Sequence, residues 1–216
     1  IAAFLGAKLW QNNSPNSSAS FTEKRLTVEG GATRLAISRD GRYAAIAQNA
    51  ALVLFDLEKE TERILLPASK DVRIMTMAFR PDNAVVYYGT RSVGATITTI
   101  YSGPLEGGEP TKRLDDVYGA ITFSPDGSKF AFVRRYSELN EFVLLTAAAD
   151  GSNIGKLASS KQPNNFDGTP NWSPDGSRIA VSAFREEGGF HYNAAIVDVA
   201  TGAVNFVPNS RWKLMN

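Results

Sequence analysis

The residues that could carry hydrolytic or metal chemistry are sparse in this sequence. It has no cysteine, which excludes a thiolate nucleophile, a disulfide and cysteine-ligated zinc. Its one histidine, His191, lies in 188–192, which we interpret as a loop between two strands. A serine hydrolase would need a Gly-x-Ser-x-Gly elbow, and the sequence has none. We therefore favour a surface or packing role for His191 over a ligand contact, and we expect no metal and no cofactor.

Two other arrangements could carry chemistry, and neither is well formed. The segment Gly151-Ser152-Asn153-Ile154-Gly155-Lys156-Leu157 is one residue too short between its glycines for a phosphate-binding loop, and it ends in leucine where a magnesium-binding hydroxyl is needed. The acidic pairs Asp115-Asp116 and Glu186-Glu187 would point to opposite faces of a strand. We interpret both pairs as solvated.

Four aspartates recur in a short turn motif. The motif begins at Ser38, Arg80, Ser124 and Ser173, so its spacing is 42, 44 and 49 residues. Proline presets φ, glycine or asparagine accepts left-handed geometry, and the aspartate can accept hydrogen bonds from nearby backbone amides. We therefore assign a structural role in the turns, in place of calcium binding or catalysis, to Asp40, Gly41, Asp82, Asn83, Asp126, Gly127, Asp175 and Gly176.

The segments between these motifs read as short strands. Each motif is followed by alternating runs rich in β-branched and aromatic residues, then by a turn and a short fourth strand. Helical periodicity is nearly absent. A repeat of this length is typical of propeller blades. The sequence predicts an all-β fold, a β-propeller of four-stranded antiparallel blades, with blades at about 32–66, 74–114, 118–158 and 169–207.

The Ser-Pro-Asp-Gly turns at 124–127 and 173–176, with the aromatic residues Phe123 and Trp172 before them, resemble TolB-like β-propeller repeats. The segments 104–110 and 149–152 strengthen the resemblance, which covers about residues 23–207. Such propellers have six or more blades, so the resemblance implies that four blades of a larger ring are present. A closed four-bladed ring is the alternative. In either ring, a strand at 23–28 would pair with the last blade and close the circle.

The first residues suggest an attachment. Residues 1–10 are largely apolar but too few to span a bilayer, which needs about 20. They are followed by a polar linker at 11–22. We interpret 1–10 as the tail of a transmembrane helix, with a buried start of the domain as the alternative. The arrangement resembles the periplasmic or extracytoplasmic half of bacterial inner-membrane proteins that carry a Ser/Thr kinase or a winged-helix domain.

Charge and motifs favour a non-catalytic module for protein–protein interaction or ligand sensing. The chain has 23 basic and 22 acidic residues, without a basic cluster for nucleic acid. The partner, a protein or a small ligand, is not specified by the sequence. Two alternatives stay open: the gating propeller of a prolyl-oligopeptidase-type serine peptidase, and a free periplasmic TolB-like protein.

Propeller geometry would place a ligand at the mouth of the central channel, which the innermost strands line. The candidates near the start of those strands are Arg34, Arg73, Tyr118, Asp167 and Asn171. An aromatic patch for a partner would use Phe190 and Tyr192 beside His191, together with Phe166 and Trp172. For Trp172 we favour a place in the core.

Overall fold

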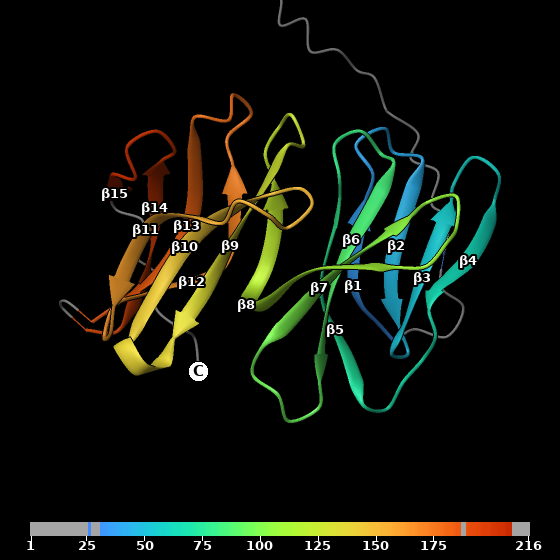
Figure 1. The fold of residues 1–216 in the computed structure, drawn as a ribbon, viewed down its shortest axis with the longest axis horizontal. Helices are drawn as coiled ribbons and strands as arrows, with labels where there is room; N and C mark the ends of the chain where they lie inside the picture. The colour runs from blue at the N-terminus through green and yellow to red at the C-terminus, as the bar shows by residue number, and fades with distance from the viewer. Residues whose placement is uncertain (1–25, 27–30, 187–188, 209–216) are drawn as a thin grey trace, which may run out of the picture.

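The computed structural model describes residue 26, residues 31–186 and residues 189–208 (Figure 1). The predicted tail at 1–10 and linker at 11–22 lie outside these residues, and so does the predicted strand 23–28 except for Leu26. No helix in the described part of the chain is long and apolar enough to cross a membrane.

Short antiparallel strands make up the described chain, with one 3-10 turn, η1 (Ser137–Leu139). The strands are β1 (Ala32–Ile37), β2 (Tyr43–Gln48), β3 (Ala51–Asp56), β4 (Thr61–Leu66), β5 (Val72–Phe79), β6 (Val85–Ser92), β7 (Thr98–Pro104), β8 (Thr111–Phe123), β9 (Lys129–Tyr136), β10 (Glu141–Ala148), β11 (Gly155–Lys161), β12 (Asn165–Trp172), β13 (Arg178–Arg185), β14 (His191–Asp198) and β15 (Val204–Phe206). The predicted all-β class is confirmed.

These strands form four successive antiparallel units. Unit 1 is β1–β4 and unit 4 is β12–β15, each a separate sheet. Between them, β5–β11 form one continuous sheet, because β8 belongs to two units. Its first half pairs with β7 and completes unit 2, while its second half pairs with β9 and begins unit 3. The units follow one another along the longest axis of the molecule, as the colours from blue to red in Figure 1 show.

The shared strand β8 differs from the sequence analysis, which separated two blades between 114 and 118. The chain stays extended there and changes partner instead. Asp116 has φ +60°, and the pairing register shifts between Thr98 and Ile100 of β7, opposite this segment, and between Tyr118 and Thr122 of β8 itself. Irregularities of this kind bend and twist a strand, which lets one strand serve two sheets.

Apolar seams hold the units side by side. In β9, Phe130 and Phe132 face unit 2, whereas Ala131 and Val133 face unit 4. All four are buried, because a strand covered on both faces needs apolar residues at every position. A third seam, around Leu54 and Tyr88, joins units 1 and 2.

The innermost strands set the two ends of the molecule. β1 contacts β5, β5 contacts β8, and β8 contacts β12, so the first strands of neighbouring units lie next to one another. Each leads into an Asp-containing turn. We call this end the turn end, and the end at which the innermost strands begin the mouth end.

Candidate functional site

At the mouth end, every innermost strand is irregular close to its start. The pairing register shifts at Ala32/Arg34, Ile74/Thr76, Tyr118/Thr122 and Asp167/Asn171. Such shifts re-aim side chains and are frequent beside functional sites. The sequence-predicted candidates Arg34, Arg73, Tyr118 and Asp167 all lie at or next to these shifts.

The structure brings three of the predicted residues together across units 3 and 4. The hydroxyl of Tyr192 donates a hydrogen bond of 2.9 Å to Oδ2 of Asp167. This bond, and then burial, raises the pKa of Tyr192. Tyr118 is close enough to both for electrostatic interaction, although burial is the main cause of its raised pKa. These groups form a polar cluster at the mouth end.

A cavity of about 350 Å³ opens beside Tyr118, between units 2 and 3. Its lining adds two arginines that the sequence analysis did not single out, Arg91 at the end of β6 and Arg135 at the end of β9. Arg91 could have been found from the hairpin register, since it lies directly opposite the candidate Arg73. The full lining is Arg91, Ala95, Thr96, Ile97, Asp116, Val117, Tyr118, Arg135 and Ser137.

The other candidates lie apart from this cluster. Nε of Arg34 donates to the carbonyl of Ile74 at 3.2 Å, which ties β1 to β5. Arg73 is exposed at the start of β5. Asn171 is also exposed, and its Nδ2 donates to the carbonyl of Thr169 at 3.1 Å.

An aromatic group stands at the same end of unit 4. The rings of Phe184 and Phe190 stack with centroids 5.6 Å apart, and Tyr192 meets Phe184 edge-on at 5.5 Å. Phe190 is 63% exposed. Of the other aromatics proposed for this patch, Phe166 is buried in the seam between units 3 and 4, and Trp172 packs against it. The sequence analysis missed Phe184, whose place follows from its pairing with Tyr192.

His191 does not lie in a loop, as the sequence analysis expected. It is the first residue of β14, paired with Arg185, because the strand begins earlier than the two glycines before it suggest. Its side chain is only 4% exposed, and Nδ1 lies 2.5 Å from the carbonyl oxygen of Gly189. This burial leaves the imidazole little surface for a partner.

The turn residues hold the opposite end together. Oγ of Ser38, Ser124 and Ser173 donates to the aspartate two residues on, at 2.6, 2.5 and 2.6 Å. Asp82 instead binds Arg80. Hydrogen bonds from serine hydroxyls lower the pKa of Asp126 and of Asp175 to about 2, and the pKa of Asp40 is also lowered. The position after each aspartate has positive φ: Gly41, Asn83, Gly127 and Gly176.

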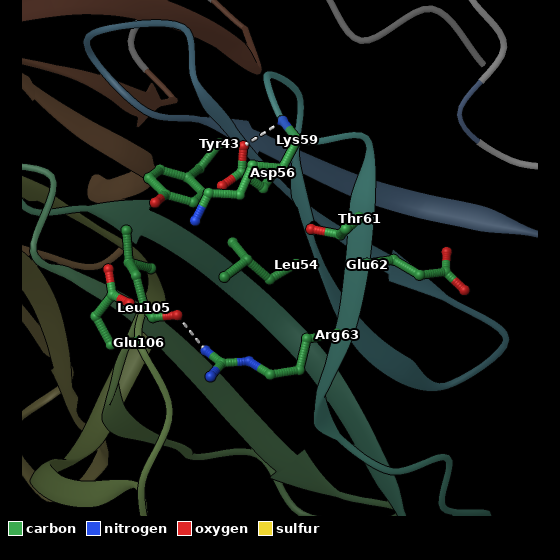
Figure 2. Close-up of a pocket in the computed structure, with 9 residues that line it drawn as sticks. All are labelled: Tyr43, Leu54, Asp56, Lys59, Thr61, Glu62, Arg63, Leu105 and Glu106. Carbon is green, nitrogen blue, oxygen red and sulfur yellow. Dashed lines mark hydrogen bonds between the residues drawn. The ribbon is translucent and has the colours of Figure 1, made fainter.

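A second, smaller cavity of about 160 Å³ lies between units 1 and 2 (Figure 2). Its arginine, Arg63, is already engaged, since Nη2 donates to the carbonyls of Leu105 at 2.5 Å and Pro104 at 3.1 Å. The carboxylate of Asp56 likewise accepts the backbone amide of Lys59 at 3.0 Å. The bonds of Arg63 therefore join the two units, whereas the bond to Asp56 closes the turn between β3 and β4 of unit 1. Among the residues that the structure describes, no three His, Asp or Glu side chains gather as metal ligands would.

Comparison with known proteins shows the fold. No protein-family model and no curated protein matches the sequence. Solved structures do match, among them the putative TolB of Agrobacterium tumefaciens, with a TM-score of 0.62 and 20% identity over 83% of this chain. TolB of Acinetobacter baumannii gives 0.64 and 21% over 85%. A putative dipeptidyl aminopeptidase IV from Bacteroides ovatus gives 0.60 and 11% over 79%.

This chain spans only part of those proteins: the matches cover 62% of the first TolB, 44% of the second and 32% of the peptidase. At identities this low, the likeness extends to architecture alone. The four antiparallel units are thus those of a TolB-like β-propeller.

Proposed function

We propose that this chain is the non-catalytic propeller part of a larger bacterial membrane-anchored protein, in which it binds a protein partner or ligand on the extracytoplasmic side. The apolar residues 1–10 and the polar stretch 11–22 support an anchor. In this proposal the propeller acts as the sensor of a Ser/Thr kinase or winged-helix regulator.

The exposed aromatic group at the mouth end carries the proposal of binding. Phe190 lies 63% exposed and stacks on Phe184, beside the hydrogen-bonded pair Tyr192 and Asp167. A large apolar ring held rigidly in water costs free energy unless a partner covers it. Tyrosine, phenylalanine and arginine are the residues enriched in the buried centres of protein interfaces.

Site-specific photo-crosslinking in the native cell tests this proposal. A photoreactive phenylalanine analogue replaces Phe190 in the full-length protein. The matched control carries the analogue at Ser177, an exposed residue at the turn end of the same unit, just before β13 begins. We expect one defined adduct from position 190 and none from position 177. Equal adducts from both positions, or none from either, would contradict binding at the mouth end.

The similarity to a peptidase propeller supports a second candidate, the gating domain of a prolyl-oligopeptidase-type enzyme. The similarity to TolB supports a free periplasmic protein. The protein sequence encoded upstream and downstream of this chain distinguishes the sensor, the peptidase domain and the free periplasmic protein. A kinase or winged-helix domain and a complete membrane helix upstream would support the sensor. A downstream Gly-x-Ser-x-Gly with a later histidine would support the peptidase, and a cleavable signal peptide directly upstream the free protein.

A further inference from the structure

We propose that the cavity between units 2 and 3 binds a monovalent carboxylate carried on a short apolar group, with Arg91 and Arg135 as its charge partners. The proposal rests on the proposed binding function and names the chemistry that the mouth end recognises. The cavity, at about 350 Å³, is at the small end of the usual range for ligand pockets.

The two arginines carry charge that the protein does not neutralise. In the described ranges, neither Arg91 nor Arg135 has a carboxylate within ion-pair distance. Arg91 is half-buried at the end of β6. Arg135 is exposed at the end of β9, and its guanidinium lies 5.6 Å from the ring centre of Phe142, which orients it. A guanidinium held in place beside a cavity suits the planar geometry of a carboxylate.

The nearby acids are already engaged. Oδ2 of Asp116 lies 3.4 Å from Nε of Arg134, which also donates to the backbone carbonyl of Asp116 at 3.0 Å. Asp167 accepts the hydroxyl of Tyr192. The charged residues of the lining are Arg91, Arg135 and Asp116, which gives the cavity an excess of one positive charge. Arg73 lies outside the lining of the cavity.

The rest of the lining supplies neutral donors and an apolar wall. The phenol of Tyr118 and the hydroxyls of Thr96 and Ser137 can donate to an oxyanion. Ala95, Ile97 and Val117 form the apolar part. An excess of one charge and an apolar wall fit a carboxylate on a hydrocarbon body better than a doubly charged phosphate.

Calorimetric titration of the purified chain with 4-phenylbutyrate tests the proposal, with the uncharged 4-phenylbutyramide as the matched ligand control. We expect saturable binding of the acid and none of the amide. Arg91→Gln and Arg135→Gln each lose a hydrogen bond to a charged group, so each should weaken binding by about tenfold to a hundredfold. Arg39→Gln removes the same charge from an exposed residue at the turn end and should leave binding unchanged.

Two further arms keep the test decisive. Tyr118→Phe should weaken binding about tenfold without changing any charge, and circular dichroism verifies that each variant is folded. A short peptide with a free α-carboxylate, set against its C-terminal amide, separates a peptide ligand from a free acid. Binding of the peptide acid alone would assign the site to a partner's C-terminus, and binding of phenylbutyrate alone to a metabolite.

Several outcomes would overturn the carboxylate site: acid and amide binding equally, inorganic sulfate binding as tightly as the acid, failure of both acids to bind, or equal effects of Arg91→Gln and Arg39→Gln. None of them bears on crosslinking from position 190, which tests the proposed binding function separately.

Discussion

The turn end and the mouth end differ in how similar the four units are at equivalent positions. At the turn end, equivalent positions carry nearly the same residues. Ser38, Ser124 and Ser173 each donate a hydrogen bond to the aspartate two residues further on in their own turn. At the mouth end, the starts of the innermost strands carry arginine in units 1 and 2 (Arg34 and Arg73) but Tyr118 in unit 3 and Asp167 in unit 4, so charge and size change along the chain.

The difference separates residues with a structural role that every unit shares from residues that can differ between units. Each turn must reverse the chain and meet its neighbour: the amide of Arg39 donates to Oδ1 of Asn83 at 3.0 Å, and Gly127 lies against Pro81. That task is the same four times, so the residues are nearly the same, and in the second turn Arg80 takes the place of the serine that binds the aspartate. No such repeated task constrains the mouth end, so its residues can differ from unit to unit, and Tyr118 of unit 3 forms a polar cluster there with Asp167 and Tyr192 of unit 4.

The largest effect should come from a turn-end glycine that touches the neighbouring unit. A Cβ on Gly151, at φ +90°, would lie 2.0 Å from the carbonyl oxygen of Arg113 in the preceding unit. Gly151→Ala must therefore shift backbone as well as strain φ, and we expect it to destabilise the fold by about 2–4 kcal/mol. Urea unfolding followed by circular dichroism measures the change.

Gly41→Ala is the matched control for Gly151→Ala. Its φ is +75°, yet a Cβ there has no atom within 4 Å, so only the backbone strain of about 1 kcal/mol remains. Equal losses in the two variants would mean that contact between units adds nothing at the turn end.

The turn end should also govern stability in acid. Hydrogen bonds from Ser124 and Ser173 hold the pKa of Asp126 and Asp175 at about 2, below the ordinary value of about 3.9 in an unfolded chain. A carboxylate with a lowered pKa stabilises the fold above about pH 4, and this contribution is lost as the pH falls through about 2. The double variant Asp126→Asn/Asp175→Asn should thus be less stable at neutral pH and lose less on acidification.

Urea midpoints between pH 2 and pH 6 measure this dependence. Asp71→Asn, at an exposed carboxyl of the mouth end, removes a charge outside the turns and should keep the slope of the parent chain. A double variant whose midpoints parallel those of the parent would show that the serine–aspartate bonds do not stabilise the turns.

The sequence predicted the turn end better than the mouth end. The recurring motif predicted the strands and the aspartate turns, because turn chemistry is local and depends on a few adjacent residues. In the structure, Tyr118 lies where β8 begins to pair with β9, and Asp167 lies near the start of β12. It could not show that Tyr192 reaches Asp167, since that contact spans 25 residues and depends on the register shift between Asp167 and Asn171.

The missed residues were beyond local patterns for a physical reason. Arg91 and Arg135 lie at the ends of the second strands of their units. At such a position, an arginine in solvent and an arginine that lines a cavity give the same alternation of polar and apolar residues in the sequence. Only the packing of unit 2 against unit 3 decides which one it is. The shared strand β8 was missed similarly. Asp115 and Asp116 were interpreted only as solvated residues, whereas β8 continues through the bend at Asp116 and changes its partner there.

The smallest effect should come from the mouth end, and it should appear in alkali. The hydrogen bond to Asp167 raises the pKa of Tyr192, so the folded chain holds this phenol protonated above pH 10, where an unfolded chain loses the proton. The contribution is therefore complete below about pH 10 and is lost as the pH rises further. Tyr192→Phe should lower the free energy of unfolding by about 1 kcal/mol at neutral pH and make stability fall less steeply in alkali.

Tyr87→Phe sharpens the comparison, because the buried Tyr87 donates to the carbonyl of Ala149 at the turn end. At neutral pH, we expect the urea midpoint of Tyr87→Phe to lie further below that of the parent chain than the midpoint of Tyr192→Phe does, and the reverse order would assign the greater rigidity to the mouth end.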